Sequence, residues 1–312
     1  MKKISLFTPC YNEEENVYEM YRKVTEVMAG LTDYIYEYIF IDNCSTDNTP
    51  AILRKIAKED KRVKVIFNIK NFGPSRSGSY GFFQTSGDVS ICFACDFQDP
   101  PELIPEFIKI WEKGSKVVWG QKSGSEENKV MYLIRCLYYK IIKNMSNEKQ
   151  YENVTGFGLY DKEVLDLMRH VGDPTPNFRN LVAEFGYEVE MIEYYQPKRE
   201  RGKSSYNFFS YFNTAMNSLI TTSRFPLRMA TFCGMTFSVI SFLVGLVYLI
   251  LKLLYWDSFT IGMAPMVIGL FFLGAIQLLF IGIIGEYIGE ILTRIMHRPM
   301  VIEKERINFD EE

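Results

Sequence analysis

A chain of 312 residues is long enough for one large domain with an appendage, or for two domains. Its net charge of −3 and isoelectric point near 5.7 argue against a nucleic-acid-binding protein. The six cysteines follow no disulfide-like spacing, which is typical of proteins of the reducing cytosol. We expect no secretory signal, because the apolar run near the start is short and reaches Pro9.

The first half of the chain alternates predicted strands with predicted helices. Runs of apolar and β-branched residues predict the strands, and apolar residues at helical spacing predict the helices. This alternation is typical of an α/β fold with a doubly wound, mostly parallel sheet. In chain order the expected elements are strand 3–9, helix 17–29, strand 36–41, helix 51–59, strand 63–68, helix 75–85 and a central strand, 91–95.

Acidic side chains follow two of these strands. Asp42 ends the second strand, and Asp96 ends the central strand just before Gln98, Asp99 and two prolines. Carboxylates at the carboxyl end of a buried strand lie where α/β sheets bind ligands. Hard oxygen donors at this spacing suit Mg²⁺ or Mn²⁺ held together with substrate phosphates. An alternative is that Asp99 only caps the helix opening at Pro100, with Asp96 in an ordinary turn.

Cationic residues mark the next part of the chain. Its expected parts are helix 103–112, strand 116–120 followed by Lys122, helix 128–144 with Arg135, a glycine-broken segment 154–160, helix 164–170, strand 189–195 and a basic loop, 198–203. The loop carries Arg201 and Lys203 just before the sequence becomes strongly apolar. Such a loop can bind a lipid phosphate, or it can simply attract an anionic membrane surface.

The last third predicts a protein of the membrane. Residues 208–220 place an apolar face beside a polar one, which is typical of an interfacial helix, although a core helix is the alternative. Two uncharged runs follow, 232–251 and 258–285, and crossing a bilayer takes roughly 20 residues. Arginine and lysine cluster before the first run and after the second, so the positive-inside rule places both termini in the cytoplasm.

These features divide the chain into four expected parts. They are a cytoplasmic α/β domain at 1–205, an interfacial amphipathic helix at 206–228, a hairpin of two transmembrane helices at 229–290 and a cytoplasmic tail at 291–312. The arrangement predicts a multi-pass protein of the cell membrane, in contact with the lipid bilayer and with its α/β domain in the cytoplasm.

Several short motifs carry a resemblance to a known family. They are TPCYNEE at 8–14, IDNCSTD at 41–47, NFG at 71–73, DFQDPPE at 96–102, FPLR at 225–228 and GEYIG at 285–289. Over essentially its whole length the chain resembles the family 2, GT-A-fold glycosyltransferases that act on polyprenyl phosphates. These include bactoprenol glucosyltransferases and dolichyl-phosphate mannose synthases. The motifs that flank the apolar runs are more specific than those of the general fold.

The resemblance implies inverting transfer of a sugar from a nucleotide donor, such as a UDP-hexose, to undecaprenyl phosphate at the cytoplasmic face, for cell-surface glycan modification. The implied donor-binding residues are Pro9, Tyr11, Glu13, Asp42, Lys122 and Lys203, and the implied ligands of Mg²⁺ or Mn²⁺ are Asp96 and Gln98. The implied catalytic residues are Asp96, Asp99, Arg135 and Arg201, with Lys122, Arg135 and Arg201 near the acceptor phosphate. A homo-oligomer is expected.

The chain departs from the family pattern at four places. Asn43 replaces the second acid of the usual Asp-Asp pair, and Ala94 replaces the first acid of the usual Asp-x-Asp motif. Residues 155–158 read Thr-Gly-Phe-Gly where relatives carry a Gly-Asp-Phe-Arg-like segment, so a carboxylate often treated as the base is absent. Residues 202–205 read Gly-Lys-Ser-Ser in place of Gly-x-Ser-Lys.

These departures allow a second interpretation, a catalytically inert relative that binds nucleotide or lipid phosphate or scaffolds a membrane glycan complex. Retention of Asp42, Asp96, Gln98 and Asp99 favours the enzyme. A lipid phosphate also needs no base, because its second pKa lies near 6 and it is mostly dianionic at neutral pH. A processive polysaccharide synthase fits less well, because two spans are too few for a conducting channel and no Gln-x-x-Arg-Trp segment follows.

Overall fold

The computed structural model describes residues 1–124, 151, 153–197, 225–254, 263–296 and 298–309. The chain forms two compact units. The first comprises Met1–Lys143, Glu148–Ser205 and His297–Glu312, and the second comprises Asn144–Asn147 and Tyr206–Met296. Three predictions lie outside the described residues, namely the helix with Arg135, the basic loop with Arg201 and Lys203, and most of the interfacial helix, 206–224.

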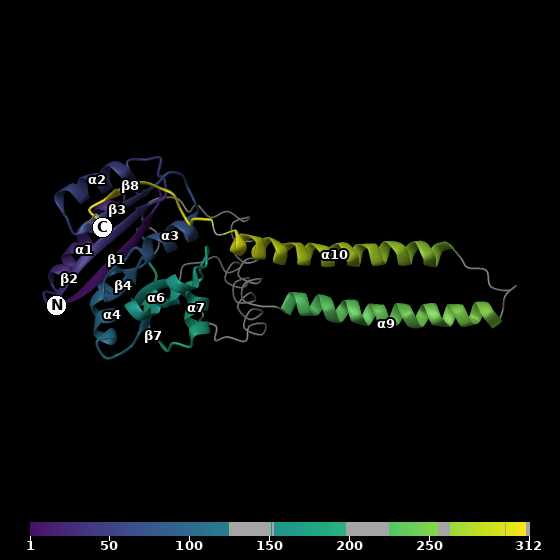
Figure 1. Ribbon diagram of the computed structural model, residues 1–312. Coiled ribbons are helices and arrows are strands. Elements are labelled where there is room, and N and C mark those ends of the chain that lie inside the picture. The colour runs from purple at the N-terminus through teal and green to yellow at the C-terminus, as the bar shows by residue number, and fades with distance from the viewer. Residues whose placement is uncertain (125–150, 152, 198–224, 255–262, 297, 310–312) are drawn as a thin grey trace. The chain divides into compact units, whose positions relative to one another are not determined.

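An eight-stranded sheet forms the centre of the first unit (Figure 1). In spatial order its strands are β7 (Val189–Tyr195), β5 (Val117–Gly124), β6 (Val154–Asp161), β4 (Val89–Cys92), β1 (Lys2–Cys10), β2 (Tyr34–Asp42), β3 (Val63–Asn68) and β8 (Glu303–Ile307). Strands β4, β1, β2 and β3 run parallel, as does the pair β5 and β7, whereas β6 and β8 run antiparallel to their neighbours. The predicted α/β class is confirmed, and the two antiparallel strands make the sheet mixed.

Helices cover both faces of the sheet, because successive strand residues point to opposite sides. Ile4 and Leu6 of β1 belong to one hydrophobic core, and Phe7 belongs to the other. The first core includes residues of α1 (Val17–Ala29), α2 (Thr49–Glu59) and α4 (Ile104–Trp111), the last of which follows the 3-10 turn η1 (Pro101–Leu103). The second includes residues of α3 (Pro74–Phe83), α6 (Lys162–Val171) and α7 (Phe178–Phe185). With both faces covered, the ends of the strands are the places left for a ligand.

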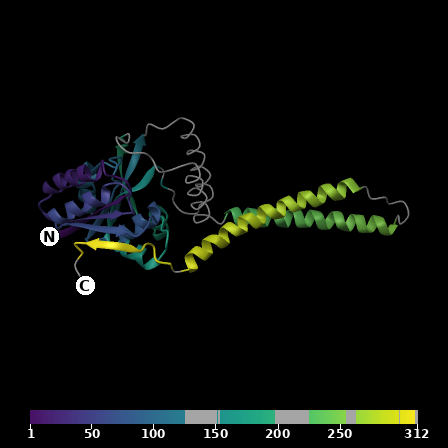
Figure 2. The same ribbon diagram turned by 90° about the horizontal axis from the view of Figure 1, so that it is seen from above.

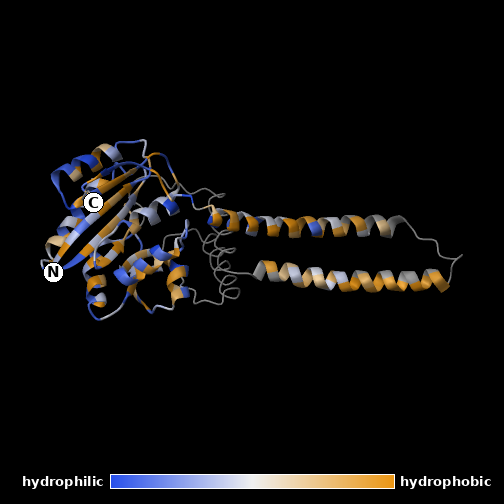
Figure 3. Ribbon diagram, viewed as in Figure 1, coloured by the Kyte–Doolittle hydropathy of each residue, from blue (hydrophilic) through white to orange (hydrophobic). Residues whose placement is uncertain are grey.

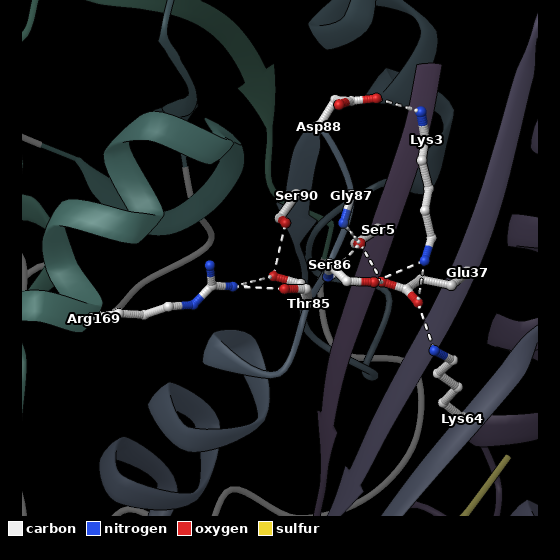
Figure 4. Close-up of polar contacts among 10 residues, drawn as sticks. All are labelled: Lys3, Ser5, Glu37, Lys64, Thr85, Ser86, Gly87, Asp88, Ser90 and Arg169. Atoms are coloured by element: carbon white, nitrogen blue, oxygen red, sulfur yellow. Dashed lines mark hydrogen bonds and ion pairs between the residues drawn. The ribbon is translucent and has the colours of Figure 1, made fainter. Parts of the chain in front are cut away.

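A buried carboxylate joins the amino-terminal parts of the central strands (Figure 4). Glu37 on β2 is 3% exposed, and its Oε2 lies 2.9 Å from Lys3 Nζ on β1 and 3.0 Å from Lys64 Nζ on β3. Its Oε1 accepts hydrogen bonds from the Ser5 hydroxyl and from the backbone and hydroxyl of Ser86. Burial alone would raise the pKa of Glu37, but these partners lower it to about 2. Glu37 thus fixes three strands and the loop before β4.

The strand β8 returns the C-terminal part of the chain to the sheet beside β3 (Figure 2). Glu305 forms an ion pair with Arg54 of α2 at 2.7 Å. Asn308 Nδ2 donates hydrogen bonds to the carbonyl oxygens of Ala57 and Val63 at 2.6 and 2.8 Å. The mostly charged sequence of this strand does not predict it. The pairing nevertheless makes the residues after the second apolar run part of the first unit.

Two long helices form the described part of the second unit, α9 (Phe225–Leu254) and α10 (Met263–Ile295), and apolar residues line both (Figure 3). They pack through Phe237 and Phe272, whose ring centroids lie 6.0 Å apart. Among the described residues one stretch, Phe272–Ile295, is long and apolar enough to cross a membrane, and Met229–Val244 is a shorter apolar stretch. The stretch Phe272–Ile295 overlaps the predicted second run, 258–285, but extends beyond it, so the two spans and the interfacial helix remain predictions.

Candidate active site

The carboxyl ends of three parallel strands bring several of the predicted site residues to one edge of the sheet. Cys10, which ends β1, pairs with Asp42, which ends β2, and β4 lies on the other side of β1. The segment after β1 carries Tyr11, which is 37% exposed, and Glu13. The segment after β4 carries Asp96. Residues that are far apart in the sequence thus gather where ligands bind in α/β sheets.

Hydrogen bonds join the loops that follow β1 and β2. The backbone N–H of Asn12 donates to Ser45 Oγ, and that of Thr46 donates to Asn12 Oδ1, both at 2.8 Å. Asn12 and Cys44 have φ of 55° and 63°, a left-handed conformation that is uncommon outside glycine. Such backbone persists only where surrounding contacts hold it, and it is concentrated at ligand sites.

Asp42 presents a buried oxygen to this edge. The residue is 2% exposed, and its Oδ2 accepts a hydrogen bond from the Ser45 backbone at 3.1 Å. Its Oδ1 is buried and has no hydrogen-bond partner among the described residues. Burial raises the pKa of Asp42, although its bonds to Ser45 oppose this. A buried acceptor of this kind is costly, so a ligand that donates a hydrogen bond to it is strongly favoured.

Glu13 is held in place in the loop that precedes α1. It is 9% exposed, and its backbone N–H donates to Thr49 Oγ1 at 2.9 Å. Its Oε2 accepts a hydrogen bond from Asn16 Nδ2 at 2.7 Å. These contacts fix the Glu13 carboxylate within the loop that joins β1 to α1.

The loop after β4 is braced by Asp99. This side chain is 7% exposed, and its two oxygens accept hydrogen bonds from the Ala94 backbone at 3.1 Å and from Tyr194 Oη at 3.0 Å. Burial raises the pKa of Asp99. Within the same loop Asp96 Oδ1 accepts from the Gln98 backbone at 3.2 Å, and Phe97 has φ of 59°. These contacts support a positioning role for Asp99, which holds the loop that carries Asp96.

Lys122 of β5 lies near this loop. Its positive charge lowers the pKa of Asp99 and so counteracts part of the effect of burial. Its backbone N–H donates to the Asn153 carbonyl at 3.0 Å, which fixes its place beside β6. Of the four cations predicted for the site, Lys122 falls within the described residues, and Arg135, Arg201 and Lys203 do not.

Comparison with known proteins assigns the chain to a family. Residues 5–168 match the model of "Glycosyl transferase family 2". The chain belongs to this family. Over 303 residues it is 32% identical to the bactoprenol glucosyl transferase of Shigella phage SfV, covering 97% of this chain and 98% of that protein. It is 30% identical over 303 residues to the prophage bactoprenol glucosyl transferase homolog of Escherichia coli K12, again over 97% of this chain and 98% of the relative.

Two solved structures are similar to this chain at low identity. The S. aureus TarS 1–349 complex with UDP-GlcNAc is 16% identical, with a TM-score of 0.46 over 70% of this chain and 66% of that one. Glucosyl-3-phosphoglycerate synthase from Mycobacterium tuberculosis, in complex with Mn²⁺, UDP and phosphoglyceric acid, is 17% identical, with a TM-score of 0.47 over 71% and 77%.

One of the four departures, the segment 155–158, lies on β6. A Cβ on Gly158 would lie 2.3 Å from the Val118 carbonyl oxygen, so only glycine fits there. Gly156 has φ of 96°, which disfavours any side chain, although the space around it is open. Asp161 ends β6, where it pairs with Val89 at the amino end of β4, and its carboxylate accepts from Trp111 Nε1 at 2.8 Å and lies 3.3 Å from Lys116 Nζ. Asp161 is thus committed to structural contacts and does not replace the missing base.

The replacement of the second acid of the Asp-Asp pair by Asn43 has a structural explanation. Asn43 Nδ2 donates to Asn71 Oδ1 at 3.0 Å. Asn43 Oδ1 accepts from Asn68 Nδ2 at 3.2 Å and from the Phe72 backbone at 3.0 Å. An aspartate at this position could accept but could not donate to Asn71. Asn43 therefore orders the loop that leads to α3, and the sequence alone gives no signal of this role.

Asp96 and Gln98, in the segment after β4, are the predicted ligands of a divalent cation that would also bind the diphosphate. No group of three or more His, Cys, Asp or Glu side chains that could hold a metal ion occurs within the described ranges. Mg²⁺, however, is commonly held by one or two carboxylates and completed by substrate phosphates and water. The carboxylate of Asp96 and the amide of Gln98 could supply such a partial set. With Ala94 in place of a second acid, we expect weaker metal binding than in family members that carry both acids.

Proposed function

We propose that the protein transfers a hexose from UDP to undecaprenyl phosphate at the cytoplasmic face of the cell membrane. The observation that carries the proposal is the likeness, over 97% of the chain, to proteins named bactoprenol glucosyl transferases. The gathering of Asp42, Glu13 and Asp96 at one edge of the sheet supports it, because such an edge is where α/β folds hold nucleotides.

The buried oxygen of Asp42 that lacks a hydrogen-bond partner is compatible with a sugar donor that contains uracil. A buried carboxylate oxygen needs a donor, and the imide N–H of uracil is one, as is the N1–H of guanine. The corresponding ring nitrogens of cytosine and adenine accept hydrogen bonds instead. A uracil or guanine nucleotide would therefore satisfy Asp42 Oδ1, which no described residue does; the choice of UDP is part of our proposal.

The proposed reaction is a single displacement that needs no enzyme base. An oxygen of the lipid phosphate attacks the anomeric carbon, the bond from that carbon to the β-phosphate oxygen breaks, and UDP leaves with the electron pair. The anomeric configuration is inverted. The acceptor is already mostly dianionic at neutral pH, which agrees with glycine at 156 and with the structural contacts of Asp161. A divalent cation at Asp96 and Gln98 would neutralise charge on the departing diphosphate.

The place of β8 supports two membrane crossings. The chain leaves the first unit before α9, and after α10 it returns to that unit, where β8 pairs with β3. Both ends of the helical segment must then lie on one side of the membrane, so the number of crossings is even. If Phe272–Ile295 spans the bilayer, a second crossing is needed, and α9 is the segment that we propose for it. The excess of arginine and lysine on that side supports a cytoplasmic location.

A defined reconstitution tests the proposal. The purified protein is incubated with undecaprenyl phosphate, Mg²⁺ or Mn²⁺ and each of a panel of UDP- and GDP-sugars, and the lipid products are identified by mass spectrometry. We expect a hexosyl lipid phosphate from one UDP-hexose and no product from undecaprenol, whose hydroxyl would require a base. Efficient transfer to undecaprenol, or transfer from GDP-sugars alone, would contradict the proposal.

A further inference from the structure

Two exposed isoleucines from distant parts of the sequence lie side by side in the first unit. Ile69 is 55% exposed and Ile302 is 52% exposed, and the Ile69 backbone N–H donates to the Ile302 carbonyl at 3.0 Å. Lys70 Nζ lies 5.1 Å from the centre of the half-buried Phe72 ring. The exposed Lys70 follows Ile69 in the chain, and the exposed Arg298 lies four residues before Ile302. Ile69, Ile302, Lys70 and Arg298 are here called the Ile69–Ile302 surface.

This surface lies at the same edge of the sheet as the candidate active site. Asp42, at the carboxyl end of β2, pairs with Phe67 of β3, and the next residue of β3, Asn68, pairs with Glu303 of β8. Ile69 and Ile302 therefore extend directly from the carboxyl end of β3. A partner bound at the Ile69–Ile302 surface would face the edge that carries Asp42.

The connectivity of the chain keeps this surface close to the bilayer. The apolar stretch Phe272–Ile295 ends α10, and only Met296 and His297 separate Ile295 from Arg298. At no more than about 3.6 Å per residue, Ile302 lies within about 25 Å of the end of that stretch, and Arg298 within about 11 Å. Arg298 and Ile302 thus follow the proposed span closely enough for lipid headgroups to be within reach.

We propose that the Ile69–Ile302 surface docks on anionic phospholipid headgroups, an inference that rests on the membrane crossing of Phe272–Ile295 proposed above. Exposed Lys70 and Arg298 match the negative charge of such lipids, and isoleucine side chains insert among the headgroups and upper acyl chains. Docking turns the carboxyl edge of the sheet toward the plane in which a lipid phosphate is held. The surface therefore presents the donor site to a membrane-bound acceptor.

Site-specific photo-cross-linking tests this docking. A benzophenone amino acid replaces Ile302, Ile69 or, as a control, Ile35 in the full chain, and each protein is placed in nanodiscs with or without phosphatidylglycerol. Ile35 is a matched control, because it is 50% exposed but lies near the amino end of β2, paired with Lys3. After irradiation, lipid adducts are measured by mass spectrometry.

We expect lipid adducts at positions 302 and 69, several-fold more of them with phosphatidylglycerol, and few at position 35. Combining Lys70→Glu with Arg298→Glu should reduce the adducts several-fold in the anionic nanodiscs. Equal yields at all three positions, yields insensitive to charge, or cross-links to a second copy of the chain would overturn the proposal. Because this readout needs no nucleotide sugar, it is independent of whether the proposed sugar transfer is observed.

Discussion

Replacing Glu37 by glutamine should destabilise the first unit in a pH-dependent way. The carboxylate is 3% exposed and lies within 3.0 Å of two lysine ammonium groups, Lys3 and Lys64. The pKa of Glu37 falls from an ordinary 4.5 to about 2. At about 1.4 kcal/mol for each pH unit, this fall corresponds to a stabilisation of about 3 kcal/mol. Solvent around the partly exposed lysines reduces that value somewhat.

The sign of this effect is fixed by the lowered pKa. A carboxylate with a lowered pKa stabilises the folded state fully above its unfolded pKa, and that contribution is lost as the pH falls toward 2. Glu37→Gln should therefore lower Tm at pH 7 by roughly 6–12 °C, at about 2–4 °C per kcal/mol. The difference from the wild type should shrink between pH 4.5 and pH 2.

Thermal unfolding of the full chain in detergent, followed at several pH values, measures this difference. Glu112→Gln is the control, because Glu112 also pairs with a lysine, Lys2 at 2.9 Å, but at the surface, where such pairs contribute little. A Glu37→Gln protein as stable as the wild type at pH 7, or a deficit that stays constant as the pH falls, would refute the reasoning.

Three further predictions concern the candidate site. Asp42→Asn should raise the KM for the UDP-sugar by about 10–100-fold, the value of a hydrogen bond to a charged group, and leave the KM for lipid phosphate unchanged; equal changes in steady-state kinetics would contradict this. Tyr194→Phe removes a hydrogen bond from the buried Asp99, so it should cost about 1–3 kcal/mol in unfolding experiments and lower kcat more than it changes either KM; an unchanged kcat would argue against positioning of the Asp96 loop. The pH profile of the rate should rise with one ionisation, near that of the acceptor phosphate at about 6, and a second, enzyme-borne basic limb would show that a base exists.

Much of the fold follows from local sequence pattern. Runs of apolar and β-branched residues predict the parallel strands, and apolar residues at helical spacing predict the helices between them. Acidic residues after two strands predict the edge of the sheet at which Asp42 and Asp96 lie. The central strand is predicted at 91–95, but β4 spans Val89–Cys92. Beyond it the Ala94 backbone N–H donates to the Asp99 side chain instead of to a neighbouring strand. That contact involves a folded loop whose shape the pattern does not encode.

The features that the sequence does not predict depend on partners far away along the chain. Strand β8 is short and mostly charged, and its stability comes from pairing with β3 and from contacts such as that between Glu305 and Arg54. Tyr194 is one residue of an ordinary strand until the fold places it against Asp99. A glutamate in a strand is ordinarily expected to face solvent. Glu37 is instead buried, and lysines of two neighbouring strands pair with its carboxylate.

Sugar transfer by Asp96→Asn protein, compared with the wild type, tests the central claim most directly. The product is hexosyl undecaprenyl phosphate made from the UDP-hexose that the wild type uses, and equal Tm values confirm that both proteins are folded. We predict metal-dependent turnover by the wild type, loss of turnover in chelator, and no turnover by Asp96→Asn. Full activity of the variant or of the chelated enzyme would contradict the role of Asp96. A folded wild type that binds UDP and makes no product from any donor would instead identify an inert relative.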